Sequence, residues 1–433
     1  MPDLRHCVYR TAAALIRLAV SHSIPPGKGR DVRSLNILPS LPAGRGRVGA
    51  AELALAVATF TIGTGEFALM AVLPGVARSL GVSVPVAGHV ISAYALGVVV
   101  GAPLITIIGA GLSRRRLLLV LQALFVVGNA ASVLSPGYRS LFYARFLTGL
   151  PHGAFYGVAA LVMAAMVEPG RRGRAVAGVF VGLTVAHVVG VPLTTWGGQL
   201  LGWRMMYGVI TIMSVLALGL IARNVPEVAA EPSSAPLREL GALGRPQVWF
   251  TLATGAIGFG GMFCVGTYMS EVLLTVTHAP VWVVPLAQSL WGVGMVAGNM
   301  AGARLVDVSP ARAVVVTLAG STLMSCLFPI CAGNPGLILL VISLMGGIIA
   351  LLPALQTRLM DVTGNAQVLA AALNHSAVNI ANAFGAWLGG AVIAAGYGAQ
   401  SVGWAGACLS AAGLAVFTLA LVAQRLERRH MPA

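Results

Sequence analysis

The chain has 433 residues, of which 58% are hydrophobic and only 9% are charged, and its mean hydropathy is +0.88. A soluble domain of this length carries many more charged residues, because its surface must be solvated. Apolar stretches of about 20 residues recur along the chain, and each is long enough to cross a bilayer as a helix. These stretches are continuously apolar, which disfavours a transmembrane β-barrel. We therefore predict an all-α membrane protein.

The positive charges are distributed in a pattern that indicates membrane orientation. The formal net charge is +15, and of the 27 Lys and Arg residues eight precede residue 48, 15 lie in the even-numbered connections or the C-terminal tail, three lie in odd-numbered connections, and one, Arg145, lies within a span. This bias is typical of loops on the cytoplasmic side. We expect a monomer in the lipid bilayer of the cell (cytoplasmic) membrane, with both termini cytoplasmic and no nucleic-acid partner.

Twelve apolar segments are predicted to be transmembrane helices. They cover residues 51–73, 86–110, 117–135, 140–167, 175–200, 205–222, 247–274, 282–303, 312–333, 336–359, 367–395 and 401–424. A polar, Pro-rich connection separates the first six from the last six and is typical of a linker. The predicted units are an N-terminal six-helix bundle (50–222), a cytoplasmic linker (223–246), a C-terminal six-helix bundle (247–424) and a basic tail (425–433).

Residues 1–49 are basic, contain many Pro and Gly residues, and include no long apolar run. We expect a disordered cytoplasmic arm. Two alternatives are an upstream start that the native protein does not use and an amphipathic helix on the membrane surface.

The two halves share weak internal similarity. Gly97 and Gly101 in the second span correspond to Gly294 and Gly298 in the eighth, 197 residues later. A Pro-Gly pair and a Gly-Gly pair recur at similar offsets and in the same order. Such a parallel repeat predicts two pseudo-symmetric bundles with a binding site near the bilayer midplane between them.

Two ionisable residues lie deep in apolar segments. Glu66 is in the middle of the run from Leu53 to Leu73, and Arg145 lies within the fourth span. Such residues usually face the interior of a bundle or a water-filled path, because exposing them to lipid is costly. Burial favours the neutral form of a carboxyl group, and water or a nearby cation restores its charge. Glu66 is therefore the candidate proton carrier, with a purely structural carboxyl group as the alternative.

Histidines in the spans are further candidates for proton transfer. His152 follows Arg145 by seven residues and shares its helix face, and His187 lies in the fifth span. His89 and His375 are interpreted as structural, since a lone histidine among small residues is usually a hydrogen-bonding partner between helices. The five cysteines have no ligand spacing, so we predict neither a metal nor a cofactor.

The sequence resembles the major facilitator superfamily, and in particular its drug:proton antiporter branch with the arabinose-induced sugar-efflux and chloramphenicol-resistance exporters. The most specific stretches are GTGEFALMAVLPGVARSLGVS (63–83), VAGHVISAYALGVVVGAP (86–103), RFLTGLPHGAFYGV (145–158) and NIANAFGAWLGG (379–390). The resemblance implies the twelve-helix major facilitator fold over about Leu53 to Arg425.

The resemblance also implies roles for individual residues. Arg145 matches the family's span-four arginine, which is implicated in proton coupling, and Glu66 is its expected acidic partner. Two alternatives for Arg145 are pairing with backbone carbonyls and a position nearer the outer interface, to which its long side chain would extend. Gly178, Gly182, Gly190 and Pro192 are similar to the antiporter motif of span five, although a Val stands between the last Gly and the Pro.

One loop departs from the family pattern. The connection between spans two and three keeps the arginines Arg114, Arg115 and Arg116, but Ala110 stands where the family has an aspartate. The second-half copy retains an acid, Asp307. We expect these four charged residues to control gating between the halves.

Other polar and aromatic residues are candidates for lining the transport cavity. Asn379 and Asn382 are three residues apart and share a helix face. The aromatic candidates are Phe67, Tyr94, Phe155, Tyr156 and Tyr268. Packing between helices is the alternative role for both groups.

The predicted function is secondary active efflux of a small, amphipathic compound in exchange for protons by alternating access. No Walker sequence is present, so a gradient must supply the energy. A sugar or metabolite exporter that works by facilitated exchange is the alternative within transport, and a non-transporting membrane sensor is the alternative outside it. The few intramembrane ionisable residues do not form the cluster that a membrane-embedded enzyme needs.

Overall fold

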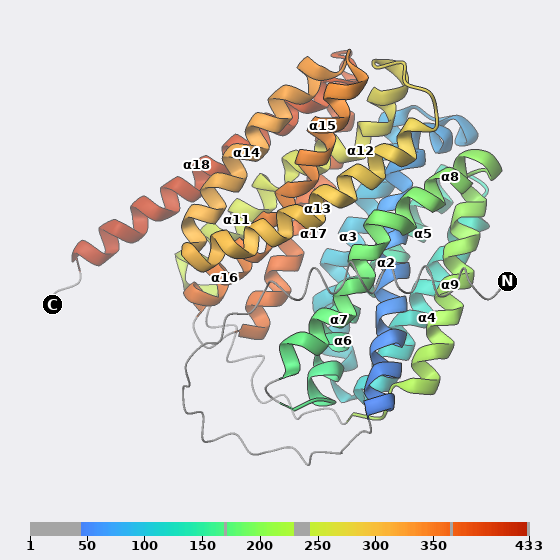
Figure 1. Ribbon diagram of the computed structural model, residues 1–433, viewed down its shortest axis with the longest axis vertical. Helices are drawn as coiled ribbons and strands as arrows, with labels where there is room; N and C mark the ends of the chain where they lie inside the picture. Colours follow the sequence, from blue (N-terminus) through green and yellow to red (C-terminus); the bar gives the residue numbers. More distant parts are fainter. Residues whose placement is uncertain (1–44, 169–170, 229–242, 364–366, 431–433) are drawn as a thin grey trace. The chain divides into compact units, whose positions relative to one another are not determined.

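The computed structural model describes residues 45–168, 171–228, 243–363 and 367–430 (Figure 1). These residues belong to one compact unit, Ala43–Ala433, and all regular elements in this part of the chain are helices. The expected arm lies outside the described residues except for its last five residues. Those five residues begin the first described helix, α2.

The first six predicted spans are all helical. Their elements are α2 (Arg45–Leu80), α3 (Val84–Ile108) with the 3₁₀ turn η1 (Gly109–Gly111), α4 (Arg114–Val133), α5 (Tyr138–Gly149) with α6 (His152–Ala165), α7 (Arg172–Val185) with η3 (Ala186–Gly190) and α8 (Val191–Leu201), and α9 (Trp203–Asn224). The fourth and fifth spans are thus interrupted helices.

The last six predicted spans are also helical. They are α11 (Pro246–Gly258) with α12 (Gly260–Thr275), α13 (Val283–Val308), α14 (Pro310–Cys331), α15 (Pro335–Gly346) with η5 (Gly347–Ala350) and α16 (Leu351–Thr363), α17 (Gln367–Ala394), and α18 (Ser401–His430). Eleven spans among the described residues are long and apolar enough to cross a membrane. The twelfth, α13, has 26 residues but is less apolar, since it includes Gln288, Asn299, Arg304 and Asp307.

The first span is longer than predicted, because α2 continues through Pro74 to Leu80. A proline has no backbone N–H, so it leaves the carbonyl four residues earlier without its helical donor. That carbonyl belongs to Met70, and the Ser270 hydroxyl of α12 donates to it at 2.9 Å. A neighbouring helix therefore satisfies the group that the proline frees, as interior prolines in membrane helices require.

The fifth span contains a π-turn, η3, directly before Val191 and Pro192. A π-turn accommodates one extra residue within an α-helix. The extra Val of the antiporter-like motif, Val191, follows this π-turn directly. The motif's glycines pack closely on α2, where a Cβ on Gly182 would overlap the carbonyl of Ala56.

The repeated glycines have the same role in both halves. A Cβ on Gly97 would overlap the Phe146 carbonyl of α5, and a Cβ on Gly294 would overlap the Ser343 carbonyl of α15. Gly101 and Gly298 make equally close approaches to Leu150 and Gly347. Each pair brings two helix backbones into direct contact, the usual function of small residues in membrane helices.

The halves meet along a set of contacts that we call the seam. It comprises the hydrogen bond from Ser270 to Met70, a 2.9 Å hydrogen bond from the Ser92 hydroxyl to the Ala383 carbonyl, and the close approach of Gly292 to η3. The Ser270 contact lies on the side where α2 ends and α3 begins, at the top of Figure 1. The main helix pairs between the halves are α2 with α12, α3 with α17, and α13 with η3 and α8.

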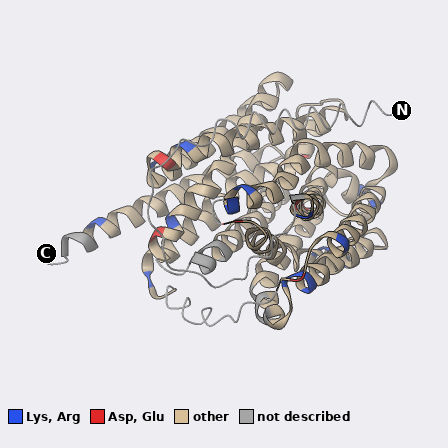
Figure 2. Ribbon diagram, turned by 60° about the horizontal axis from the view of Figure 1, so that its bottom comes forward, with Lys and Arg blue, Asp and Glu red and all other residues tan. Residues whose placement is uncertain are grey.

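The opposite ends of the helices carry most of the basic residues, and Figure 2 turns this side forward. Here Arg115 and Arg116 lie 3.7 and 3.9 Å from the Glu227 carboxylate, and the backbone N–H of Arg114 donates to the Val228 carbonyl at 2.9 Å. The start of the linker is therefore attached to the connection between the second and third spans.

Candidate functional site

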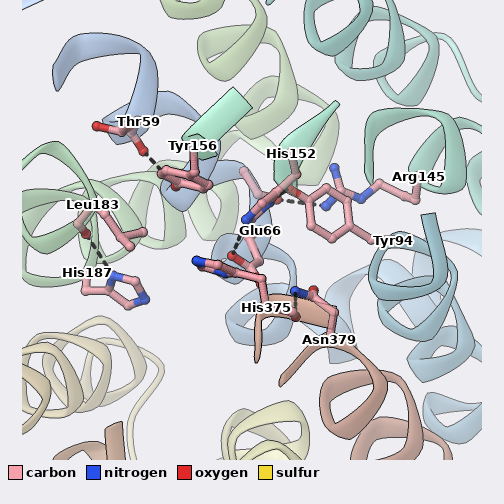
Figure 3. Close-up of polar contacts among 11 residues, drawn as sticks. Thr59, Glu66, Tyr94, Arg145, His152, Tyr156, Leu183, His187, His375 and Asn379 are labelled. Atoms are coloured by element: carbon pink, nitrogen blue, oxygen red, sulfur yellow. Dashed lines mark hydrogen bonds and ion pairs between the residues drawn. The ribbon is translucent and has the colours of Figure 1, made fainter. Parts of the chain in front are cut away.

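Glu66 points into the protein from the middle of α2. Its side chain is 9% exposed, and its Oε2 atom lies 3.9 Å from Nε2 of His152 at the start of α6. His152 is 4% exposed. The acid predicted from its depth in the sequence therefore does not face lipid, and it lies beside one of the predicted histidines (Figure 3).

Tyr94 of α3 completes a line of three polar side chains. Its hydroxyl lies 2.7 Å from Nδ1 of His152, so the imidazole contacts Tyr94 through one nitrogen and Glu66 through the other. Groups at these distances can pass a proton between them with small side-chain movements. Three helices of the N-terminal half supply the three side chains.

Arg145 of α5 is fully buried next to this line of side chains. One Nη donates to the Gly65 carbonyl at 2.8 Å, and the guanidinium lies over the rings of Tyr94 and Tyr207, 4.3 and 5.1 Å from their centroids. Its Nε and other Nη have no hydrogen-bond partner in the described part of the chain. A backbone carbonyl and two aromatic faces therefore hold the Arg145 guanidinium. Contact with a backbone carbonyl was the alternative to a direct ion pair with Glu66.

Tyr156 connects the N-terminal half to His375 of α17. Its ring centroid is 4.9 Å from that of His152 and 6.4 Å from that of His375, and its ring is nearly parallel to His375. Figure 3 shows His375 approaching the pair of Glu66 and His152 from the other half. His375 is interpreted as structural from sequence, because a lone histidine gives no signal of a partner 219 residues away in the chain.

His187 lies apart from this cluster, in the π-turn η3. Its ring packs on Phe67, 4.4 Å between centroids, and its Nδ1 is 2.8 Å from the Leu183 carbonyl. Its Nε2 is buried and has no hydrogen-bond partner among the described residues. Of the two predicted histidines, only His152 is placed beside Glu66.

The other predicted cavity residues have different surroundings. Asn379 donates to the His375 carbonyl at 3.0 Å, whereas neither amide atom of the buried Asn382 has a partner in the part that the structure describes. Phe155 is fully buried in the core, and the Tyr268 hydroxyl donates to the Ala386 carbonyl at 2.8 Å. Both asparagines lie on α17, which packs along α3 of the other half.

The predicted gating residues are not all together. Arg115 and Arg116 contact Glu227, while Asp307 at the end of α13 is exposed and forms no ion pair within the described residues. Glu227 was not predicted, although its position in the linker, 113 residues after Arg114, offers an acid to the arginines. Across the part of the chain that the structure describes, no three His, Cys, Asp or Glu side chains are arranged to hold a metal ion.

Comparison with known proteins agrees with the fold. Residues 55–307 match the sequence profile of the Major Facilitator Superfamily. The chain is 40% identical to the inner membrane transport protein YdhP of Escherichia coli K12 over 86% of its length and 96% of that protein. It is 31% identical to a chloramphenicol resistance protein of Streptomyces lividans, over 84% of the chain and 94% of the relative.

A solved structure has the same architecture. A bacterial homologue of the human lysosomal transporter Spinster superposes with a TM-score of 0.70 over 90% of this chain and all of that one, at 14% identity. The predicted resemblance and the twelve-helix fold are thereby confirmed. The chain belongs to the major facilitator superfamily and is a multi-pass membrane transporter, not an enzyme.

Proposed function

We propose that this transporter exports a small amphipathic compound from the cytoplasm in exchange for protons. Both termini and the arginine-rich loops would lie in the cytoplasm, in keeping with the excess of Lys and Arg there. The seam would then close the outer side, and the described structure would correspond to an inward-facing state. The name of the chloramphenicol-resistance relative supports small-molecule export.

The observation that carries this proposal is the contact between Glu66 and His152, buried beside the fixed charge of Arg145. A buried carboxyl group is stable when neutral, and it needs water, an imidazole or a cation to become charged. Arg145 cannot act as the proton carrier, because its guanidinium does not lose its proton. It favours the ionised form of Glu66 electrostatically, and the carboxyl group is the site that binds and releases the proton.

The proposed cycle uses these groups in turn. Glu66 binds a proton when the site opens to the outside and releases it, by way of His152 and Tyr94, when the site opens to the cytoplasm. Substrate enters from the cytoplasm while the carboxylate is charged, and protonation accompanies its release outside. The stacking of His375 on Tyr156 links the change of charge in the N-terminal half to α17 of the other half.

One observation favours the alternative of sugar or metabolite exchange. The amide of Asn382 and the amide oxygen of Asn379, which have no hydrogen-bond partner among the described residues, are suited to hydroxyl groups of a polar substrate. Facilitated exchange would move no protons, so a pH-sensitive dye inside vesicles separates the two functions.

The test uses the full chain in inverted membrane vesicles with labelled chloramphenicol as the probe. Glu66→Gln removes the titratable group but keeps its size, and we expect it to lower gradient-driven accumulation by about a hundredfold or more. Glu168→Gln, an equivalent change at an exposed residue, is the control and should leave accumulation unchanged. Undiminished accumulation by the Glu66→Gln variant would exclude the coupling role.

A further inference from the structure

Cations and aromatic rings form a continuous row from the start of α9 to the surroundings of Glu66. The guanidinium of Arg204 lies over the indole of Trp203, 4.2 Å from the ring centroid. One turn further along α9, Tyr207 meets Trp203 edge to face, with 6.1 Å between centroids and 86° between ring planes. The Arg145 guanidinium in turn lies over the Tyr207 ring at 5.1 Å. We call these four residues the row.

The Arg204 end of the row is anchored to two other helices of the same half. One Nη of Arg204 donates to the carbonyl of Ser135, which follows α4, at 2.8 Å, and the other donates to the Ser79 hydroxyl of α2 at 3.4 Å. The preceding residue, Gly202, has a φ of 86°, a conformation that favours glycine, and it allows α9 to begin directly after α8. Trp203, only 4% exposed, is therefore held between the protein interior and the Arg204 guanidinium.

The other end of the row orients a guanidinium that has few hydrogen bonds. Only one of the three guanidinium nitrogens of Arg145 has a hydrogen-bond partner among the described residues, the Gly65 carbonyl. One hydrogen bond does not fix the plane of a guanidinium, whereas stacking on aromatic faces does. Tyr94 and Tyr207 supply these faces, and both rings are buried. Because Gly65 directly precedes Glu66, a guanidinium held here lies close to the carboxyl group.

The ring of Tyr207, and not its hydroxyl group, makes the contact with Arg145. The hydroxyl is buried and has no hydrogen-bond partner in the part of the chain that the structure describes. A buried hydroxyl without a partner costs free energy, so it does not explain a tyrosine at this position. Phenylalanine would keep the contact with the guanidinium, and leucine would remove it.

We propose that Tyr207 is a positioning residue that sets the proton affinity of Glu66 through Arg145, and that Trp203 supports it. This inference rests on the proposed function, because the transport cycle uses the charge of Glu66. A guanidinium held beside a carboxyl group favours its ionised form. Without the ring of Tyr207, the guanidinium is held less firmly near Glu66 and favours this form less. Glu66 then keeps its proton up to a higher pH.

The experiment titrates Glu66 by infrared spectroscopy of the full chain in lipid nanodiscs. A protonated carboxyl group absorbs at a higher frequency than an ionised one, and the band of Glu66 is the one that Glu66→Gln removes. We expect Tyr207→Leu to raise the midpoint pH, at which half of this band is lost, by about one unit, or about tenfold in proton affinity. Trp203→Leu should raise the midpoint by less, because the Tyr207 ring remains. Tyr207→Phe should keep the wild-type midpoint.

Phe328→Leu is the control for lost packing, because Phe328 is a fully buried ring on α14 of the other half. It should lower thermal stability as Tyr207→Leu does and leave the midpoint unchanged. The positioning role is wrong if Tyr207→Leu leaves the midpoint unchanged, if Tyr207→Phe or Phe328→Leu shifts it equally, or if wild-type Glu66 shows no titrating band. Should Tyr207→Leu not fold, an unchanged midpoint in Trp203→Leu is the contradicting result.

The same variants separate this role from proton coupling. If the midpoint moves as expected while Glu66→Gln still accumulates labelled chloramphenicol in vesicles, the coupling proposal fails and the positioning role of Tyr207 stands. If Glu66→Gln abolishes accumulation while Tyr207→Leu leaves the midpoint unchanged, the coupling proposal stands and the positioning role fails.

Discussion

Nε2 of His152 lies 3.9 Å from the Glu66 carboxylate while its Nδ1 lies 2.7 Å from the Tyr94 hydroxyl. The imidazole thus lies between Glu66, the proposed proton-binding acid, and the Tyr94 hydroxyl. Each of its two nitrogens makes a different contact. A substitution at His152 that keeps only one of these polar contacts should therefore interrupt proton transfer between Glu66 and Tyr94.

The first prediction therefore concerns His152→Asn. We expect proton release from the interior of inverted vesicles to the medium to slow by about a hundredfold, because an amide cannot exchange a proton as an imidazole does. Substrate binding should remain near the wild-type level. Stopped-flow measurement of an internal pH dye checks the rate, and Asn in place of His89 provides the comparison. A normal rate in the His152 variant would remove this residue from the proton path.

The second prediction concerns the cation between the two tyrosine rings. Arg145→Lys should destabilise the protein by about 2 kcal/mol, because a lysine cannot contact both rings and the Gly65 carbonyl at once. The same change at Arg139, which is exposed on the same helix, should have no measurable effect. The stability of the two variants is compared by thermal unfolding, monitored by size-exclusion chromatography. Equal stability would mean that the rings of Tyr94 and Tyr207 do not hold the charge.

The third prediction concerns the repeated glycines. Gly97→Ala and Gly294→Ala should each cost about 1–3 kcal/mol of stability, since the added methyl group would meet a backbone carbonyl of a neighbouring helix. Gly219→Ala on α9, where a Cβ has no atom within 4 Å, should instead be neutral or stabilising. The same unfolding assay applies. A similar outcome at all three sites would contradict the close helix contacts.

The fourth prediction concerns orientation. In a background without native cysteines, Ser83→Cys between α2 and α3 should react with a membrane-impermeant maleimide added to intact cells. Gly111→Cys, exposed in η1 on the opposite side, should react only after the membrane is opened. The reverse pattern would invert the proposed topology and the direction of transport.

The sequence was sufficient to predict most of the architecture. Continuous apolar runs define most of the spans to within a few residues. The depth of Glu66 in its span identified it as an acid whose side chain faces the protein interior. The end of α2 was harder to predict, because Pro74 suggests a helix end unless the Ser270 hydroxyl is known to satisfy the Met70 carbonyl. That donor comes from the other half of the chain, and periodicity carries no information about it.

Several site residues, such as Glu66, could be identified individually from the sequence, but their grouping was predictable only where they are close in sequence. Arg145 and His152 share a face of one span, so their association could be anticipated. Tyr207, which covers the Arg145 guanidinium, and His375, which stacks on Tyr156, reach the site from distant helices. Nothing in their local sequence distinguishes them from packing residues, and only the packing of α9 and α17 brings them to the site.

The hydrogen bonds of the seam join neutral hydroxyls to backbone carbonyls, and within the described residues no ion pair joins the two halves. A bond of this type contributes about 1 kcal/mol, so breaking these hydrogen bonds requires only a few such small losses. On the same side Glu271 of α12 and Arg78 of α2 attract each other electrostatically, so opening this side also weakens one attraction between opposite charges. Because the acceptors are main-chain oxygens, Met70 and Ala383 can be replaced by other residues without removing these hydrogen bonds.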